Sequence, residues 1–415
     1  MRIRTLAAIT AALLMGAAPL ASSAKELIVY HGWSTPSEVG ALHIFQDALA
    51  AKGHSWKDLA IPHNSGVNVS LVNMVTGGNP PNLFVNSDPG VFRDLAKLGL
   101  ERDLTDFYAQ THIGDNFFPI IKELSTVDGK MVKIPLFMHI DGAIYWNMDV
   151  AKKAGVDPAA WTSVDQMVAD FPKIQAAGFI PVATGGQAFQ VGYLFHAMLA
   201  ATAGVDIYNR MYGAQPDRTV IDTPEVRKVL DFIRTVSNFA PPEAENRPWN
   251  EETHTVIEGQ ALLQIMGDWM KGEWLAAGKK PGVDFGCAVI PGTKAVAVTA
   301  DAMGALGGQD ADTDKAELDF VAAVEDPATL AKANQAKGST PPRSDAPTEF
   351  LDMCNKVAMD ALSKPNGQVA NPFNITDTDW HNGIWNAVYA FWADKSQTDD
   401  QAVAALQDAY DQVFN

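Results

Sequence analysis

The sequence predicts an α/β fold made of two interleaved lobes, and three observations support this prediction. The chain has 415 residues, which is more than one hydrophobic core normally supports. Segments with strand-like and helix-like patterns alternate along it. No linker rich in Pro, Gly and Ser divides it, so we expect the chain to cross between the lobes more than once.

The N-terminal part of the chain predicts a βαβα unit. Residues 26–31 (ELIVYH) are typical of a buried strand, and residues 37–51 are typical of a helix. A second helix is expected at residues 67–76, followed by a strand at 83–86 and a helix at 91–98. This order of elements usually produces a mainly parallel sheet.

Two later helices carry clear start signals. Asp222 or Thr223 can cap a helix whose first turn holds Pro224. Thr398 and Gln401 have the spacing of a capping box. The first of these helices would bury an apolar face formed by Val226, Val229, Leu230, Ile233 and Val236.

Two short extended segments, residues 133–137 and 294–299, are the best candidates for the crossings between the lobes. The N-terminal lobe would then comprise residues 25–135 plus 297–345, and the C-terminal lobe residues 136–296 plus 346–415.

Residues 1–24 have the pattern of an export signal. Arg2 and Arg4 precede an apolar run at residues 6–20, which is too short for a transmembrane helix. Small residues follow, and we expect cleavage after Ala24.

The formal net charge of −18 bears on the partners of the protein. A chain this acidic is repelled by nucleic acid and by anionic membrane surfaces. We therefore expect a neutral small-molecule ligand and no nucleic-acid partner. We also expect a monomer.

Cys287 and Cys354 are the two cysteines of the sequence. In an exported protein they are most simply a disulfide pair, which would stabilise the fold by about 4 kcal/mol in the chain-entropy model. Two buried free thiols are the alternative.

The sequence contains no HExxH zinc motif, no phosphate-binding loop and no GxSxG elbow. Its nine histidines show no metal-ligand spacing with cysteine. Carboxylates are plentiful, so composition leaves a glycosidase pair open, although no two carboxylates share a motif. We expect a protein that is not an enzyme and needs no metal or cofactor.

Polar and aromatic residues follow the ends of six predicted strands. In open α/β sheets, ligands bind outside the carboxyl ends of the strands, so these residues could face one cleft. They are His31, Trp33 and Glu38 at the first strand, Asn86 and Asp88, His139 and Asp141, Gln187, Asp268 and Trp269, and Asp301.

This set of side chains suits a sugar. Indole rings cover the apolar face of a pyranose, while carboxylates, amides, Lys and His pair with its hydroxyls. Structural roles are the alternatives: a tryptophan after a strand is more often core, Asp268 and Glu38 can serve helix starts, and His139 can be a satisfied buried histidine. Asn86 and Asp88 can likewise form a turn.

Most of these residues lie in blocks that resemble the family 1 extracellular solute-binding proteins of carbohydrate ABC importers, and in particular periplasmic glucose-binding proteins. The most specific blocks are MGDWMKGEW at 266–274 and KGSTPPR at 337–343. The other blocks are YHGWSTPSE at 30–38, HSWKDL at 54–59, GGNPPN at 77–82, PLFMHIDG at 135–142, GGQAFQ at 185–190, KKPGVDF at 279–285 and PGT at 291–293.

The resemblance implies a bilobal Venus-flytrap fold in the periplasm that closes on a sugar and delivers it to the membrane permease subunits of an importer. Trp33 would stack on the sugar and Trp269 would supply a second ring, while Glu38, Asp301 and Lys337 would bind hydroxyls. His139 and Gln187 lie in matched loops near the cleft, and Cys287 and Cys354 match the pair of the family.

The sequence departs from the family pattern in three places. Gly32-Trp33 stands where relatives often have two tryptophans, and the segment 86–88 differs. Trp380 and His381 stand near the place of a histidine-glycine pair, and either could contact the sugar. A glucoside, a disaccharide or a polyol-linked sugar is therefore an alternative to glucose. An anionic sugar derivative is a further one, for which Lys337 and Arg343 are the nearby cations.

Overall fold

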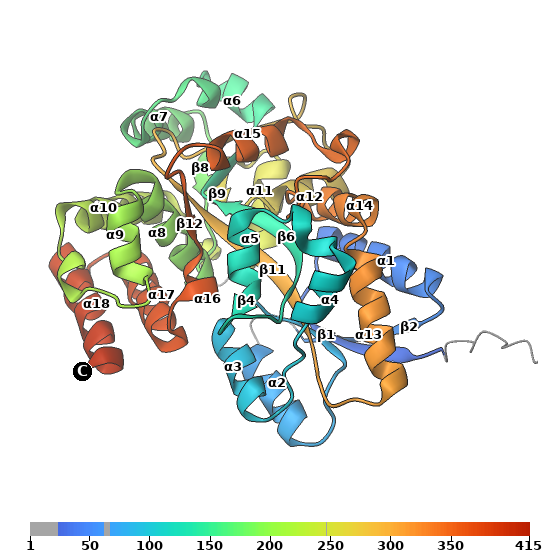
Figure 1. Ribbon diagram of the computed structural model, residues 1–415. Helices are drawn as coiled ribbons and strands as arrows, with labels where there is room; N and C mark the ends of the chain where they lie inside the picture. Colours follow the sequence, from blue (N-terminus) through green and yellow to red (C-terminus); the bar gives the residue numbers. More distant parts are fainter. Residues whose placement is uncertain (1–23, 62–66, 246) are drawn as a thin grey trace, which may run out of the picture.

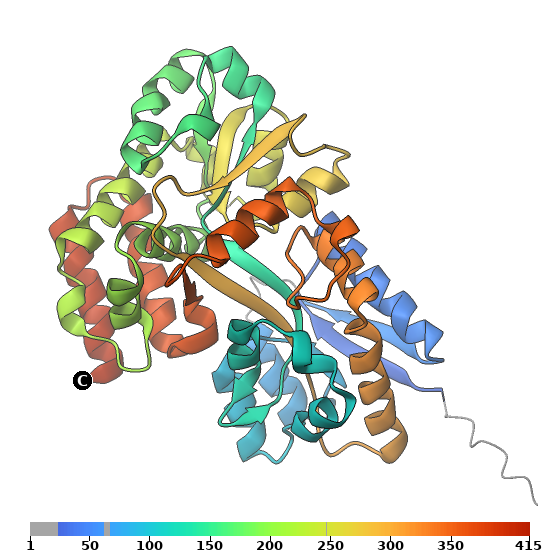
Figure 2. The same cartoon turned by 45° about the horizontal axis from the view of Figure 1, so that its top comes forward.

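The structure is a computed structural model that describes residues 24–61, 67–245 and 247–415. Apart from Ala24, the predicted export signal lies outside the described residues. Two β-sheets, each covered by helices, form two bodies that meet at a pair of long central strands (Figures 1 and 2). The predicted α/β fold with two lobes is thus confirmed.

The larger sheet is mixed. β1 is parallel to both of its neighbours, β2 and β3, whereas β11 is antiparallel to β3 and to β6. The strand order is β12-β11-β3-β1-β2, with β6 paired to β11. Its described strands are β1 (Glu26–His31), β2 (Ser55–Ala60), β3 (Leu83–Val85), β6 (Ile134–Asp141), β11 (Val296–Ala305) and β12 (Gln368–Ala370).

The predicted parallel unit is correct for the first strands but omits β2. This strand lies at the edge of the sheet, and its residues SWKDLA are mostly exposed, so it lacks the apolar run that marks β1. The sheet is mixed because β11 enters it from far along the chain, which the local order of elements does not show.

Seven helices cover the larger sheet within the described residues. Leu42 and Phe45 of the first helix and Phe320 of a late helix share its core. The helices are α1 (Pro36–Ala51), α2 (Val67–Thr76), α3 (Pro89–Lys97), α4 (Thr105–Thr111), α5 (Pro119–Ser125), α13 (Ala311–Val324) and α14 (Pro327–Lys337).

The second sheet has the strand order β10-β7-β9-β8. Its strands are β7 (Ala143–Asn147), β8 (Ile180–Ala183), β9 (Ala261–Met266) and β10 (Phe285–Val289), and a separate hairpin joins β4 (Thr126–Val127) to β5 (Lys130–Met131). The remaining helices are α6 (Met148–Ala154), α7 (Val164–Ala176), α8 (Ala188–Thr202), α9 (Val205–Tyr212), α10 (Pro224–Phe239), α11 (Trp249–Ile257), α12 (Met270–Ala276), α15 (Met353–Leu362), α16 (Pro372–Ile375), α17 (Thr378–Ala393) and α18 (Asp399–Phe414).

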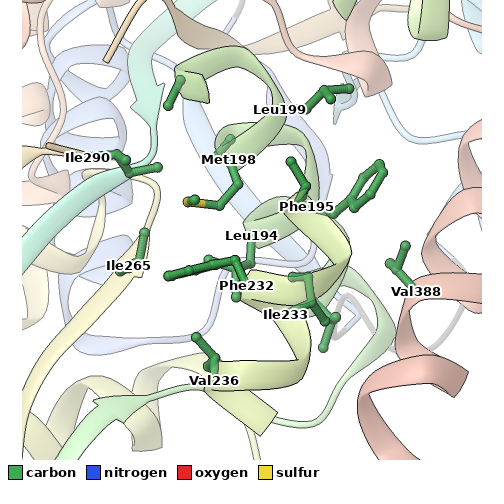
Figure 3. Packing of buried hydrophobic residues seen from close by; sticks show 14 of the residues in the cluster. Leu194, Phe195, Met198, Leu199, Phe232, Ile233, Val236, Ile265, Ile290 and Val388 are labelled. Carbon is green, nitrogen blue, oxygen red and sulfur yellow. The ribbon is translucent and has the colours of Figure 1, made fainter. Parts of the chain in front are cut away.

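Helices α8 and α10 build the largest core, shown in Figure 3. Phe195 and Met198 of α8 pack with Ile233 and Val236 of α10 and Val388 of α17. The predicted apolar face of α10 is entirely buried, and Thr223 caps the helix as expected. Each such side chain contributes roughly 1.5–3 kcal/mol through burial. The capping box of α18 at Thr398 is confirmed as well.

Strands β6 and β11 run side by side through the centre of the molecule (Figure 2). Both are longer than the short segments that the sequence predicts, since they extend to Asp141 and Ala305. β6 continues directly through Gly142 into β7 of the second sheet. Gly142 has a φ of 82°, and a Cβ there would lie 2.9 Å from the Ile290 side chain, so this link between the sheets requires glycine.

Cys287 of β10 and Cys354 of α15 form a disulfide, as predicted, with their Cα atoms 5.8 Å apart. The bond ties the late helix α15 to the second sheet across a sequence separation of 67 residues.

Replacing both cysteines should destabilise this body. We expect the C287S/C354S variant to lose about 4 kcal/mol of unfolding free energy, because the unfolded chain regains the entropy of an open loop. Denaturant unfolding measures the loss, and wild type unfolded under reducing conditions is the matched control. Equal stability of oxidised wild type and the variant would contradict the expectation.

Glu317 of α13 is a buried carboxyl group whose two oxygens have no hydrogen-bond partner among the described residues. Burial raises its pKa to about 9, against the attraction of Arg102 and with added repulsion from Asp314 and Asp310. Arg102 itself is ion-paired with Asp314 at 2.8 Å. The folded protein therefore holds Glu317 protonated at neutral pH.

This carboxyl group predicts a pH dependence of stability. Between pH values of about 4.5 and about 9, Glu317 is ionised in the unfolded chain and protonated in the folded protein. The free energy of unfolding should therefore fall as pH rises through this range. Glu317→Gln removes this ionisable group. The free energy of unfolding of the variant, relative to wild type, should therefore rise by up to about 1.4 kcal/mol per pH unit across this range. Unfolding curves at several pH values test this, and parallel curves for the two proteins would refute it.

Candidate ligand-binding site between the two sheets

The pairing of β6 with β11 brings the first site residues together. Phe137 lies opposite Asp301 and His139 opposite Thr299, so these four side chains share one face. The Nε2 atom of His139 is 3.5 Å from Asp301 Oδ2. The sequence predicts that Asp301 follows the end of its strand. Asp301 instead lies within β11, because the strand continues to Ala305.

His139 is fully buried between two carboxylates. Its Nδ1 atom is 2.6 Å from Asp268 Oδ1, on the segment that follows β9. Burial by itself would lower the pKa of His139, but the charges of Asp268 and Asp301 outweigh it and raise this pKa. Burial also raises the pKa of Asp268, against the attraction of His139 and Lys271. The ring therefore bonds Asp268 through Nδ1, while its Nε2 atom has no hydrogen-bond partner among the described residues.

Glu38 is held by the start of α1. One carboxylate oxygen accepts hydrogen bonds from the backbone N–H groups of Ser34 and Thr35, at 2.8 and 3.0 Å. Thr35 caps the same helix turn, so the pair forms a capping box. The other oxygen is 3.5 Å from Lys337 Nζ. Glu38 thus has the structural role named as the alternative and also an ion pair in the site.

Lys337 lies between two indole rings. Its Nζ atom is 5.9 Å from the ring centre of Trp33 and 6.0 Å from that of Trp269. Trp33 follows β1 of the larger sheet, whereas Trp269 follows β9 of the second sheet. Lys337 and both tryptophan residues are at most 9 % exposed. A single cation therefore contacts an aromatic side chain from each body.

Glycines make this approach possible. Lys337 ends α14, and Gly338 caps it in a left-handed conformation with φ of 89°. A Cβ on Gly338 would lie 2.3 Å from the backbone nitrogen of Gly272, in α12. Ser37 then donates its hydroxyl to Glu273 of the same helix at 2.5 Å. The end of α14 and α12 are thereby packed backbone against backbone, and the start of α1 contacts α12 through the Ser37 side chain.

The segment 86–88 joins the bodies at a second place. Asn86 accepts a hydrogen bond from the backbone of Asp88, and Asp88 caps α3, so both have the turn-forming roles considered above. Asp88 also accepts a 2.7 Å hydrogen bond from Thr378 of α17. Lys133, which is 2 % exposed, donates to the carbonyl of Ser87. Burial lowers the pKa of Lys133 to about 7.

A cavity of about 280 Å³ lies beside this contact. Of the predicted site residues it touches only Asp88, and its other walls include Arg93, Thr378 and Phe414. It is therefore separate from the side chains around Lys337.

Several predicted residues lie apart from Lys337. His31 is 3.1 Å from Asp58 of the edge strand β2. Asp141 accepts hydrogen bonds from three buried side chains, His196, Thr299 and Asn371, at 2.7–3.1 Å. These contacts assign both residues structural partners, in a network that the sequence pattern does not reveal because its members come from distant segments.

Trp380 and His381 point in different directions from α17. Trp380 is fully buried, bonds the carbonyl of Met211 at 2.9 Å and packs against Tyr410, so it belongs to the core. His381 lies 4.0 Å from the ring of Trp385, and burial, with a contribution from His196, lowers its pKa to about 4. Gln187 is half-buried at the start of α8 and accepts from Gln190.

Sequence reasoning missed two ring residues near the site. Tyr193 of α8 packs edge-to-face on Trp269 at 5.3 Å, and Trp385 lies 5.8 Å from Tyr193. Burial, followed by the charges of Asp141 and Asp301, raises the pKa of Tyr193 well above its usual value. The position of Tyr193 in the second turn after Gly185-Gly186 is the available signal, whereas no motif marks Trp385.

No helix in the described ranges is both long and apolar enough to cross a membrane. No group of three or more His, Cys, Asp and Glu residues in those ranges could hold a metal ion.

The Glu38–Lys337 pair offers a direct test of this geometry. Removing one partner leaves a buried charge without its counter-charge, so E38Q and K337M should be strongly non-additive, with a coupling energy of about 1–3 kcal/mol. Denaturant unfolding of the single and double variants measures it. The exposed pair Asp149–Lys153 on α6 is the matched control, with a coupling expected near zero. Equal coupling in both cycles would contradict the buried geometry.

Comparison with known proteins places the chain in a family. Residues 36–325 match the model of the family "Bacterial extracellular solute-binding protein". A "Probable sugar-binding periplasmic protein" of Mesorhizobium japonicum is 30% identical over 401 residues, which is 94% of each chain. A protein of the same description from Brucella suis is 31% identical over 363 residues, covering 86% of this chain and 85% of the relative.

Solved structures show the same fold. A chitin oligosaccharide binding protein aligns with a TM-score of 0.81 at 18% identity, over 94% of this chain and 98% of that one. The bacterial solute receptor AcbH, described as preferring β-D-galactopyranose, aligns with a TM-score of 0.79 at 17% identity, over 94% and 99%. The matched residues and the relatives together show that the chain belongs to the bacterial extracellular solute-binding protein family.

Proposed function

We propose that the protein binds a sugar between its two bodies, in the periplasm, and delivers it to the permease subunits of an ABC importer. The observation that carries this proposal is Lys337 between Trp33 and Trp269, one ring from each body. A pyranose presents apolar faces to indoles and hydroxyls to Lys, carboxylate and imidazole groups. The description of the relatives as sugar-binding periplasmic proteins and the predicted export signal support it.

We further propose that binding involves a hinge. The side chains around Lys337 are nearly inaccessible, so a ligand reaches them only when the bodies separate. The proposed lobes are residues 25–135 plus 297–345 and residues 136–296 plus 346–415, whose inner boundaries fall within β6 and beside the start of β11. A ligand that contacts both lobes favours the closed state, because it gains those contacts only there.

A binding role fits the carboxylates better than a catalytic one. Glu38 is held by two backbone N–H groups and Lys337, and Asp268 by His139. Arg343, considered above as a partner for an anionic sugar, instead pairs with Asp345 at 2.5 Å. The observations therefore favour a neutral sugar, either a glucose-like monosaccharide or a small glucoside.

Calorimetry with a panel of neutral sugars tests the proposal. At least one sugar should bind with an affinity near micromolar, which corresponds to about −8 kcal/mol. W33A and W269A should each weaken binding at least about tenfold, because each removes a ring that covers the sugar. W161A is the control, because Trp161 is a half-buried ring of the second body that bonds Asp170. Trp161 lies far from Lys337 in the sequence. No heat with any sugar, or unchanged binding by W33A and W269A, would reject the proposal.

A further inference from the structure

Helix α12 belongs to the second body and lies against two helices of the body built on the larger sheet, α1 and α14 (Figure 1). We call the latter the first body. Met270 and Trp274 of α12 join the core beside the second sheet, where Trp274 packs on Phe285 at 4.8 Å between ring centres. On another side of the helix, Gly272 and Glu273 contact the first body. All of these α12 residues are buried, so the helix is enclosed between the two bodies.

Gly272 lets the backbones of the two bodies touch. A Cβ on Gly272 would lie 2.6 Å from the backbone carbonyl oxygen of Lys337 and 2.7 Å from the Cβ atom of Ser37. Neither neighbour is the end of a flexible side chain that could turn aside. Because protein interiors are close-packed, a larger residue at this position would push α12 away from α14 and α1. Gly272 thus limits how near Lys337 comes to Trp269, which lies three residues earlier in the same segment.

Glu273 adds a polar contact at the same place. One of its carboxylate oxygens accepts two hydrogen bonds from Ser37, from the hydroxyl at 2.5 Å and from the backbone N–H at 3.2 Å. The other oxygen is 3.8 Å from Nε2 of His254 on α11. Glu273 is 1 % exposed and Ser37 is 2 % exposed, so water is kept from this bond while the bodies are together. Ser37 directly precedes Glu38, which places the contact beside the proposed sugar site.

Lys271 anchors α12 within the second body. Its Nζ atom donates to Asn355 Oδ1 of α15 at 2.7 Å and is 3.2 Å from Asp352. The disulfide ties α15 to the second sheet. Asn355 also donates to the backbone carbonyl of Ser339 in the first body, at 2.9 Å. Since α12 is held by its own body, it offers a fixed surface on which the first body docks.

We propose that Gly272 and Glu273 are positioning residues, which set the distance between the two bodies in the closed state. This inference rests on the proposed function, because a sugar gains contacts with Trp269 and Lys337 together only at that distance. Gly272 is the steric stop, and Glu273 is a clasp for Ser37 that breaks when the bodies separate. Neither residue contacts the sugar. Both act on the closed state, so their loss speeds the release of bound sugar and has little effect on its arrival.

The experiment measures sugar binding by variants of the stop. The probe is whichever of glucose, galactose, mannose, xylose and maltose the wild type binds most tightly in calorimetry. G272A should weaken binding at least about tenfold, because its Cβ lowers the population of the closed state. Stopped-flow tryptophan fluorescence should show this loss in the dissociation rate, with an association rate within about threefold of wild type. Small-angle X-ray scattering with saturating sugar should give G272A a larger radius of gyration than wild type.

Two substitutions of Glu273 test the clasp. E273L keeps the bulk of the side chain and loses the acceptor for Ser37, so it should weaken binding about tenfold, again through faster dissociation. E273Q keeps an oxygen that accepts from Ser37, and it should retain most of the wild-type affinity. A side chain that only fills space would give equal affinities in the two variants.

Gly40 supplies the matched control for the glycine. It lies in α1 where this helix packs on α14, and a Cβ there would be 4.0 Å from the Ala336 side chain, which is an ordinary contact. G40A should therefore keep the affinity and the dissociation rate of wild type. Melting curves report the fold of each variant, and if G272A unfolds early the comparison of E273L with E273Q decides.

The outcomes separate the two proposals. Wild-type affinity and dissociation rate in G272A and E273L would overturn the positioning role and leave the proposed function standing. A loss confined to the association rate would also overturn it, because the effect would then lie in the open state. Absence of binding by any sugar would overturn the proposed function, and the positioning role with it.

Discussion

The antiparallel pairing of β6 with β11 is the constraint on which the rest of the structure depends. β6 enters the larger sheet and leaves it through Gly142 for the second sheet, while β11 contacts β6, β3 and β12. Because side chains alternate along paired strands, His139 and Asp301 come to one face without any signal in the local sequence. A shift of one residue in the pairing would put the two side chains on opposite faces. The contact between the two bodies thus follows from strand register, and the ion pairs refine it.

Around this pair several buried polar groups bond one another. His139 bonds Asp268, and Lys337 pairs with Glu38. Asp88 accepts a hydrogen bond from Thr378 of the other body. These contacts offset part of the desolvation free energy of charges that are buried beside two indole rings. They have a consequence for binding, since a sugar must offer at least equivalent hydrogen bonds to displace or extend them. Hydroxyl groups, which both donate and accept, can do so, and under the proposed function this would favour sugars over apolar ligands.

The sequence predicted the elements with strong local signals. The start of α10 at Thr223 and Pro224, the capping box of α18 and the strand β1 all have near-local causes, and each was found where expected. Features that depend on distant segments were not predicted: the edge strand β2, the position of Asp301 inside β11, and the network around Asp141. The site shows the same division. Trp33, Glu38, Trp269 and Lys337 come together as the family blocks imply, whereas Tyr193 and Trp385 join them through helix packing at Gly192, which no motif marks.

A crystal structure with a bound sugar is the most direct test that the two bodies enclose the ligand at Lys337. The account predicts a pyranose ring in contact with Trp33 and Trp269, with Lys337, Glu38 or Asp301 bonded to its hydroxyls. A sugar bound instead in the cavity beside Asp88 and Phe414, or on the outer surface of one body, would contradict it.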